Sequence, residues 1–182
     1  MPTKELIRRE LIKRRKALSE RERAELSERV RGLLLSLPEL KSASVVALFY
    51  PVAGEPDLLP LFELLKDKLL LLPRVEGDEL VLARAEGLKK GAFGIPEPAG
   101  EPFPAEKVEL FLVPGVAFDE EGYRLGFGKG FYDRLLRGKK GFKVGVGYEF
   151  QVLKRLPRSP WDQRLDALVT EKRVRRFNHG RS

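Results

Sequence analysis

The residues with the clearest chemical potential lie in one glycine-rich segment, residues 124–134, which reads RLGFGKGFYDR. Glycine stands at every second position from 126 to 130, so the backbone can adopt positive φ and bring its N–H groups close to a ligand. A helix expected to begin at about Gly130 adds free N–H donors that favour a phosphate, and Lys129 adds a positive charge. The segment therefore predicts a phosphate-binding site of a nucleoside triphosphate enzyme.

Asp133 lies one turn into that helix, where its carboxylate can hold a Mg²⁺ ion bridging the phosphate oxygens. Mg²⁺ takes one or two protein carboxylates and completes its shell with phosphate and water. The segment is not a P-loop, because no Ser or Thr follows Lys129. The alternative is a tight glycine turn, with Lys129 in solvent and Asp133 favouring the helix start.

Two other acidic motifs also allow two interpretations each. Residues 161–166 read WDQRLD, and in them Asp162 can be a second carboxylate near the metal. The alternative, which the spacing alone favours, is that Asp162 or Asp166 forms a local cap or ion pair. In the turn FYPVAGEPD, Glu55 either accepts from the N–H edge of a flat heterocycle or is an exposed loop acid. Residues 93–98, FGIPEP, either wall that pocket or form a packed loop. The single histidine, His179, is assigned no role.

The elements expected to position these residues alternate between helix and strand. Thr3 can cap a helix running to about Leu18, and Ser19 with Glu22 forms a capping box for a second helix ending before Pro38. Further helices are expected at residues 58–66 and from Gly130. Strands are expected at residues 44–50, 69–72, 79–85, 110–114, 143–147 and 167–170, with loops at 91–104 and 115–124.

This alternation predicts one α/β domain over residues 1–182, with an open, mostly parallel sheet covered by helices on both faces. Ligands bind such sheets beyond the carboxyl ends of the strands. The turns that follow Tyr50, Pro114 and Gly147 are therefore the expected location of the site.

Composition narrows the class of protein. The 182 residues include no cysteine, which excludes disulfides and thiolate metal sites, and the first residues lack the apolar stretch of a secretory signal. No apolar run approaches the length of a membrane span. The net charge of +8 is concentrated at the two ends around a slightly acidic middle. That pattern suits a polyanionic ligand or, equally, a solvated surface rich in Arg and Glu.

Taken together, five segments in order resemble the 5-formyltetrahydrofolate cyclo-ligase family over nearly the whole chain. They are KELIRRELIKRRKAL, FYPVAGEPD, FGIPEP, LVPGVAFDEEGYRLGFGKGFYDRLL and SPWDQRLDALVTE. The resemblance implies an open α/β sheet of the kind shared with sugar-phosphate isomerases and CoA transferases. It also implies conversion of 5-formyltetrahydrofolate to 5,10-methenyltetrahydrofolate with ATP as co-substrate and Mg²⁺ as metal. In that family the formyl oxygen attacks the γ-phosphate, and N10 then displaces phosphate.

The resemblance also assigns residues by position. Arg124, Lys129 and Tyr132 are the expected catalytic residues, and Asp133 and Asp162 the expected metal carboxylates. The expected ATP-binding residues are Lys4, Arg8, Arg124, Leu125, Gly126, Phe127, Gly128, Lys129, Gly130, Phe131 and Tyr132. The expected folate-binding residues are Val52, Glu55, Phe127, Gly128, Lys129, Gly130 and Phe131.

The sequence departs from the family pattern at two positions. Trp161 stands where the family usually has His, so the assignment of Asp162 to the metal is weaker than that of Asp133. Phe131 stands where the family often has a first Tyr, which leaves Tyr132 as the hydroxyl donor there.

Two rival functions follow from other features. A different ATP-using or phosphosugar enzyme can share the same fold. The basic ends can also belong to a nucleic-acid-binding module, although the chain lacks the aromatic and basic strand face of common RNA-binding sheets. We expect a cytoplasmic, monomeric enzyme that binds neither nucleic acid nor membranes.

Overall fold

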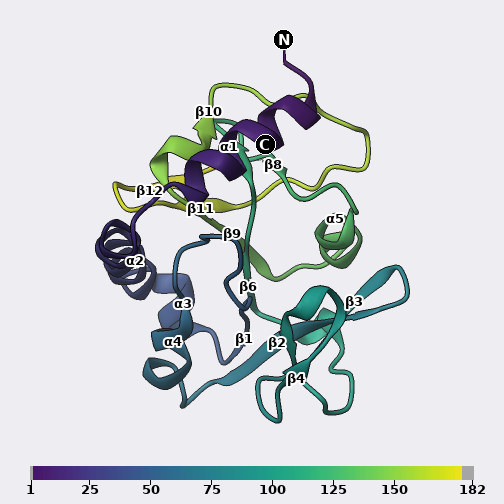
Figure 1. Ribbon diagram of the computed structural model, residues 1–182. Helices are drawn as coiled ribbons and strands as arrows, with labels where there is room; N and C mark the ends of the chain where they lie inside the picture. The colour runs from purple at the N-terminus through teal and green to yellow at the C-terminus, as the bar shows by residue number, and fades with distance from the viewer. Residues whose placement is uncertain (1, 178–182) are drawn as a thin grey trace.

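The computed structural model describes residues 2–177 (Figure 1), so His179 lies outside the described residues. The α-helices are α1 (Lys4–Lys16), α2 (Glu20–Leu35), α3 (Pro38–Ser42), α4 (Leu59–Leu64) and α5 (Phe131–Leu136). Short 3₁₀ turns occur at η1 (Ala92–Gly94), η2 (Ala105–Lys107) and η3 (Glu149–Gln151). The strands are β1 (Val45–Ala47), β2 (Leu69–Glu76), β3 (Glu79–Arg84), β4 (Lys89–Lys90), β5 (Pro96–Glu97), β6 (Leu110–Val113), β7 (Ala117–Asp119), β8 (Arg124–Leu125), β9 (Phe142–Val146), β10 (Val152–Leu153), β11 (Ala167–Val169) and β12 (Val174–Arg176).

The two amino-terminal helices begin at the predicted caps. The Thr3 side chain accepts from the Leu6 N–H at the start of α1. Ser19 and Glu22 form the complete capping box of α2, each side chain accepting from the other residue's backbone. These bonds satisfy N–H groups that a helix start otherwise leaves without partners, which is why the sequence located both starts.

A seven-stranded, mostly parallel sheet forms the centre of the molecule, in the order β12-β11-β9-β6-β1-β2-β3. The five strands from β11 to β2 are parallel to their neighbours, and β12 and β3 add antiparallel edges. The carboxyl ends of β1, β6 and β9 therefore lie at the same edge of the sheet. The turns singled out in the sequence all leave from that edge.

Helices cover both faces of the sheet, as predicted. Alternate strand residues such as Val46 and Leu112 pack with α2, α3 and α4 on one face. Their neighbours Ala47 and Phe111 pack with α5 and the segment around Val108 on the other. Helix α1 lies apart from both, across the small sheet of β10, β7 and β8 (Figure 1). This placement brings its amino-terminal half close to the glycine-rich segment.

Several elements differ from the sequence predictions. Strand β2 continues to Glu76, four residues beyond the predicted end, because it pairs with β3 as far as that residue, whereas β1 pairs with it only as far as Leu71. Past that point the missing N–H of Pro73 faces an edge, where proline is tolerated. The predicted loop at 115–124 instead contains β7 and the first residue of β8, which pair with each other. Strand β12 and the short β4–β5 pair were also not predicted.

Within residues 2–177, no helix is long and apolar enough to cross a membrane.

Candidate active site

The glycine-rich segment runs from β8 into α5; the sequence predicted the helix but not the strand. Gly128 and Gly130 have φ values of +104° and +70°, which glycine adopts without strain. Gly130 is the residue that precedes the first turn of α5. The backbone from Gly126 to Gly130 thus forms an exposed curve, the glycine curve.

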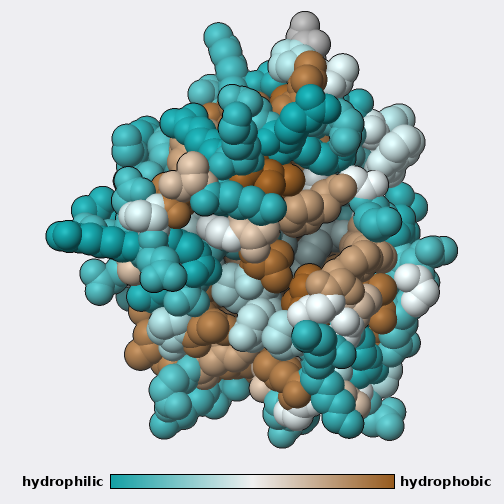
Figure 2. Space-filling view, in the orientation of Figure 1, coloured by the Kyte–Doolittle hydropathy of each residue, from teal (hydrophilic) through white to brown (hydrophobic). Residues whose placement is uncertain are grey.

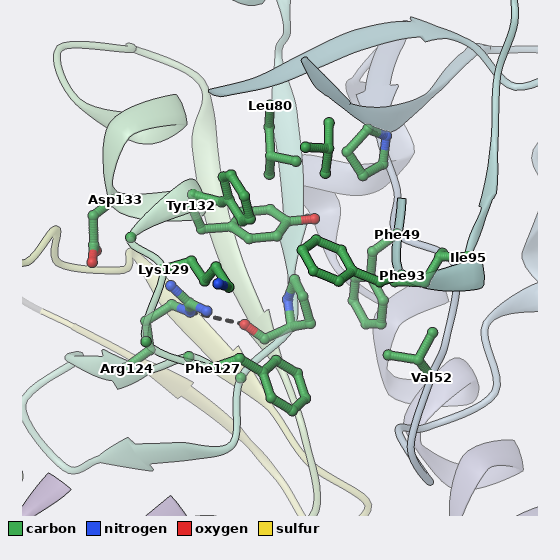
Figure 3. A pocket seen from close by; sticks show the side chains of 18 of the residues that line it. Phe49, Val52, Leu80, Phe93, Ile95, Arg124, Phe127, Lys129, Tyr132 and Asp133 are labelled. Atoms are coloured by element: carbon green, nitrogen blue, oxygen red, sulfur yellow. Dashed lines mark hydrogen bonds between the residues drawn. The ribbon is translucent and has the colours of Figure 1, made fainter. Parts of the chain in front are cut away.

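Arg124 lies beneath this curve. Its Nε donates to the Pro114 carbonyl at 2.8 Å, and its guanidinium lies over the Tyr132 ring at 5.3 Å. Burial lowers the pKa of Arg124, while the neighbouring Asp133 and Tyr132 raise it. Burial also raises the pKa of Tyr132 and keeps the phenol neutral, so its hydroxyl can donate a hydrogen bond. Figure 3 shows Arg124, Lys129 and Asp133 on one side of the pocket and Phe49, Val52, Phe93 and Ile95 on the other.

Helix α1 brings two basic side chains to the same curve. The Arg8 Nε donates to the Gly126 carbonyl at 2.8 Å, and the Lys4 Nζ donates to the Ser159 hydroxyl at 2.8 Å. Their spacing of four places both on one helical face. A Cβ at Gly128 would stand 3.3 Å from the Arg8 guanidinium carbon, so a larger residue there would require Arg8 to shift.

Asp133 and Asp162 both reach the pocket, from α5 and from the turn before β11. Asp133 Oδ1 accepts from the Gln163 N–H at 3.2 Å, which links the two segments. Asp162 Oδ2 accepts from the Ser159 N–H at 2.7 Å and lies 3.7 Å from the Lys4 Nζ. Asp162 thus has the local cap and ion pair of the alternative interpretation, while its position also suits the metal role.

These two carboxylates fit a Mg²⁺ ion that takes most of its ligands from phosphate and water. No group of three or more acidic or histidine side chains suited to a metal occurs in the described part of the chain. A metal held here would accordingly need the oxygens of a bound ligand.

Glu55 is buried, with 3% of its surface exposed, so the alternative of an exposed loop acid was wrong. Its Oε1 accepts from the Val52 N–H at 2.9 Å across a tight turn. Burial raises the pKa of Glu55 to about 7, against the opposing charge of Arg15. A carboxylate in this setting gains most from a ligand that donates hydrogen bonds to it.

Two side chains that the sequence analysis missed hold the turn of Glu55 in place. Arg15, 1% exposed, donates from Nε to the Ala53 carbonyl at 2.8 Å and from Nη1 to the Gly115 carbonyl at 3.0 Å. The Tyr148 hydroxyl donates to the Gly54 carbonyl at 2.8 Å. The turns after β1, β6 and β9 are thereby joined. The KRRK run around Arg15 gave no signal that one of its members is buried.

All the predicted site residues line one cavity of about 830 Å³. Figure 2 shows hydrophobic side chains gathered around a hollow near the centre of this face. The predicted loop at 93–98 forms part of the wall, because Glu97 Oε2 accepts from the Val75 N–H at 2.9 Å. Pro73, Val75 and Leu80 complete it from the β2–β3 hairpin. Sequence reasoning missed Pro73 and Val75 because it ended β2 too early, and it gave no role to Leu80 in the predicted strand at 79–85.

The fold and this cavity define the class of protein. It is an α/β protein with a deep, largely apolar pocket, bounded by a cationic glycine loop and two carboxylates, beyond the carboxyl edge of a parallel sheet. Such pockets are the usual location of ligand binding and catalysis in these sheets.

Comparison with known proteins identifies the family. Residues 1–171 match the profile of the 5-formyltetrahydrofolate cyclo-ligase family. The 5-formyltetrahydrofolate cyclo-ligase of Escherichia coli K12 is 32% identical over 88% of this chain and 96% of its own. The solution NMR structure of Aquifex aeolicus 5,10-methenyltetrahydrofolate synthetase superimposes with a TM-score of 0.89 at 56% identity. That match covers 98% of this chain and 95% of the other.

A second structure, a 5,10-methenyltetrahydrofolate synthetase from Mycoplasma pneumoniae, gives a TM-score of 0.78 at 29% identity, covering 93% of this chain and 99% of that one. The chain belongs to the 5-formyltetrahydrofolate cyclo-ligase family and is an enzyme. The resemblance noted in the sequence is confirmed.

Proposed function

We propose that the enzyme converts 5-formyltetrahydrofolate to 5,10-methenyltetrahydrofolate, using ATP and Mg²⁺ and releasing ADP and phosphate. The observation that carries the proposal is the shared cavity, in which the buried Glu55 and the glycine loop face one apolar space. One substrate is a flat heterocycle with N–H donors, and the other is a polyphosphate. The cavity offers a matched group to each.

The pterin is proposed to lie against Glu55 and Val52. A carboxylate accepts well from a ring N–H and an adjacent amino group, and it can bind both at once. The aromatic side chains of Phe93, Phe127 and Phe131 then surround the rest of the folate. Phe93 and Phe131 already contact each other edge to face, with ring centres 6.5 Å apart.

The triphosphate is proposed to lie on the curve of residues 126–130, with Lys4 and Arg8 reaching it from α1. The formyl oxygen attacks the γ-phosphorus, and the bond from phosphorus to the ADP oxygen breaks. N10 then attacks the activated formyl carbon and loses its proton to solvent, and the carbon–oxygen bond breaks to release phosphate. The protein orients the two reactants and neutralises the charge of the transferring group, through Lys129, Arg124 and the loop N–H groups.

Asp133 and Asp162 are proposed to hold Mg²⁺ against the same oxygens, where the ion would add charge stabilisation. Tyr132 contributes a neutral hydroxyl beside Arg124. No step requires a protein nucleophile, so a chain without cysteine can carry out the reaction. We also propose that the 182 residues act as one domain and as a monomer in the cytoplasm.

A cyclisation assay tests the proposal. Methenyltetrahydrofolate absorbance should grow from 5-formyltetrahydrofolate only when both ATP and Mg²⁺ are present. Lys129→Ala and Asp133→Asn should reduce kcat by about 10²-fold or more, the size of losing one charge-stabilising group. Both positions lie in an exposed loop and a helix start, so circular dichroism should show the wild-type fold.

Absence of the chromophore with the pure wild-type enzyme would refute the proposed reaction. Loss of folding in both variants would refute the roles of Lys129 and Asp133. A phosphosugar enzyme of the same fold would leave 5-formyltetrahydrofolate unchanged while acting on a sugar phosphate.

A further inference from the structure

The glycine curve has a second hollow on its outer side, of about 410 Å³. Its walls are formed by Gly128, Lys129, Gly130, Asp133, Arg134, Arg137 and Trp161. Lys129, Asp133 and Trp161 also line the main cavity, so the two spaces meet at the glycine curve. A ligand that has its phosphates on the curve can therefore extend in both directions.

Trp161 supplies the aromatic surface of this second hollow, and 54% of the residue is exposed. The backbone around it is nevertheless held firmly in place. The Ser159 N–H donates to Asp162 Oδ2, the Asp162 N–H donates to the Ser159 carbonyl at 3.1 Å, and the Gln163 side chain donates to the Trp161 carbonyl at 2.9 Å. A large apolar side chain is thus presented to solvent from a fixed turn beside the phosphate loop.

One of the cationic side chains in the wall of the hollow, Arg134, is engaged by the protein itself. The Arg134 guanidinium donates to the carbonyls of Asp78 and Lys129 and lies 5.6 Å from the centre of the Phe131 ring. It therefore shapes the wall rather than offering free donors to an anion. The hollow therefore presents to a ligand the exposed Trp161 side chain together with Lys129 and Arg137.

We propose that Trp161 stacks on the purine base of the nucleoside triphosphate, with the base in the second hollow. This inference rests on the proposed function, because it takes the triphosphate to lie on the glycine curve. The γ-phosphate must point into the main cavity to meet the formyl oxygen, so the base end of the nucleotide leaves on the opposite side. A purine offers the indole a larger stacking surface than a pyrimidine does. Trp161 accordingly favours ATP over CTP.

The chain contains a single tryptophan, so intrinsic tryptophan fluorescence reports on this site alone. ATP with Mg²⁺, added without folate, should quench the emission, whereas inorganic tripolyphosphate should not. Tripolyphosphate should instead reverse the quenching by ATP, since both compete for the glycine curve. CTP should quench less and require a higher concentration.

Substitutions supply the second readout. Trp161→Ala should raise the KM for ATP by about 5- to 150-fold, the range for losing one base–aromatic stack. The KM for 5-formyltetrahydrofolate, the inhibition constant of tripolyphosphate and the Mg²⁺ concentration for half-maximal rate should stay unchanged. Trp161→Phe should recover most of the ATP affinity. Leu64→Ala, which removes a comparably exposed apolar side chain from α4, should behave as wild type.

Wild-type turnover separates this inference from the proposed function. A wild-type enzyme that neither binds ATP nor cyclises the folate refutes both. An enzyme that cyclises normally, yet shows no quenching by ATP or equal quenching by tripolyphosphate, refutes only the stacking role. An unchanged KM for ATP in Trp161→Ala refutes it as well, and a shifted Mg²⁺ requirement would assign the effect to Asp162 instead.

Discussion

At the scale of single residues, burial raises the pKa of the Glu55 carboxyl. Its carboxylate lies 3% exposed, and the nearby Arg15 only partly offsets the cost of removing the charge from water. Burial therefore leaves its pKa at about 7, from the ordinary 4.5. A ligand that donates two hydrogen bonds to the anion would stabilise the charged form.

We predict that the affinity for 5-formyltetrahydrofolate rises with pH through a midpoint near 7, because only the anion accepts both hydrogen bonds. Glu55→Gln should bind the folate at least about tenfold more weakly, because it loses a charged acceptor. Its affinity for the folate should show no pH midpoint near 7. Titration calorimetry between pH 5.5 and 8.5 measures both effects. A midpoint kept in Glu55→Gln would assign the titration to another group.

The Glu55 carboxyl also makes the free energy of unfolding fall as pH rises. Below about pH 4.5 the carboxyl is protonated in both the folded and unfolded states, and above about 7 it is ionised in both. Between these values the folded state binds more protons, so the unfolding free energy of the unliganded enzyme decreases as pH rises. The decrease attributable to Glu55 is at most about 3 kcal/mol. Urea unfolding of Glu55→Gln should lack this part of the decrease.

At the scale of elements, three turns from neighbouring strands form the Glu55 side of the pocket, and side-chain hydrogen bonds hold them together. Tyr148, directly after β9, donates to the Gly54 carbonyl, and Arg15 at the end of α1 donates to the turns after β1 and β6. Gly54 has φ +79°, and a Cβ there would stand 3.1 Å from the Arg15 carbonyl oxygen. Glycine thus suits the positive φ of this turn, and these hydrogen bonds stabilise its shape.

We predict that Tyr148→Phe raises the KM for 5-formyltetrahydrofolate by about fivefold, the worth of one neutral hydrogen bond of about 1 kcal/mol. The KM for ATP should stay unchanged, because the Glu55 turn and the glycine curve come from different elements. Tyr123→Phe, which removes a hydroxyl away from this turn, is the matched control. Equal effects on both KM values would instead indicate a general loss of structure.

At the scale of the whole molecule, the pocket walls come from segments that span the chain. Helix α1, the Glu55 turn, the β2–β3 hairpin, the loop at 93–98, the glycine curve and the turn of Asp162 all contribute. A ligand that fills the space therefore links elements on both sides of the central sheet, and its binding energy adds to the stability of the whole fold.

We predict that 5-formyltetrahydrofolate and ATP with Mg²⁺ each raise the melting temperature. At a hundredfold excess over Kd, binding adds about 2.7 kcal/mol, which corresponds to about 5–10 °C for a chain of this length. Glu55→Gln should lose about half or more of the shift from the folate, because a tenfold weaker Kd leaves about 1.4 kcal/mol, and it should keep the shift from ATP. Equal loss of both shifts would contradict separate subsites, and free glutamate serves as the negative control.

Much of the fold followed from local signals. Thr3 and the Ser19–Glu22 pair located the helix starts, and short apolar runs located the parallel strands, because caps and burial depend on neighbouring residues. β12 and the β7–β8 pair were missed although each pairs with a strand nearby in the chain, because strands of two or three residues are too short to show an alternating pattern. The length of β2 was misjudged because Pro73 was taken to end the strand, whereas proline does so only where its N–H is needed.

The sequence by itself determined the family, the α/β class and the glycine curve, because these reside in residue types at fixed spacing. Only the tertiary structure decided that Glu55 is buried and that the buried Arg15 holds the turns after β1 and β6 together. It also decided that Pro73, Val75 and Leu80 line the pocket. It also left Trp161 exposed beside the curve. Burial and exposure are set by contacts between segments far apart in the chain, and no local pattern contains that information.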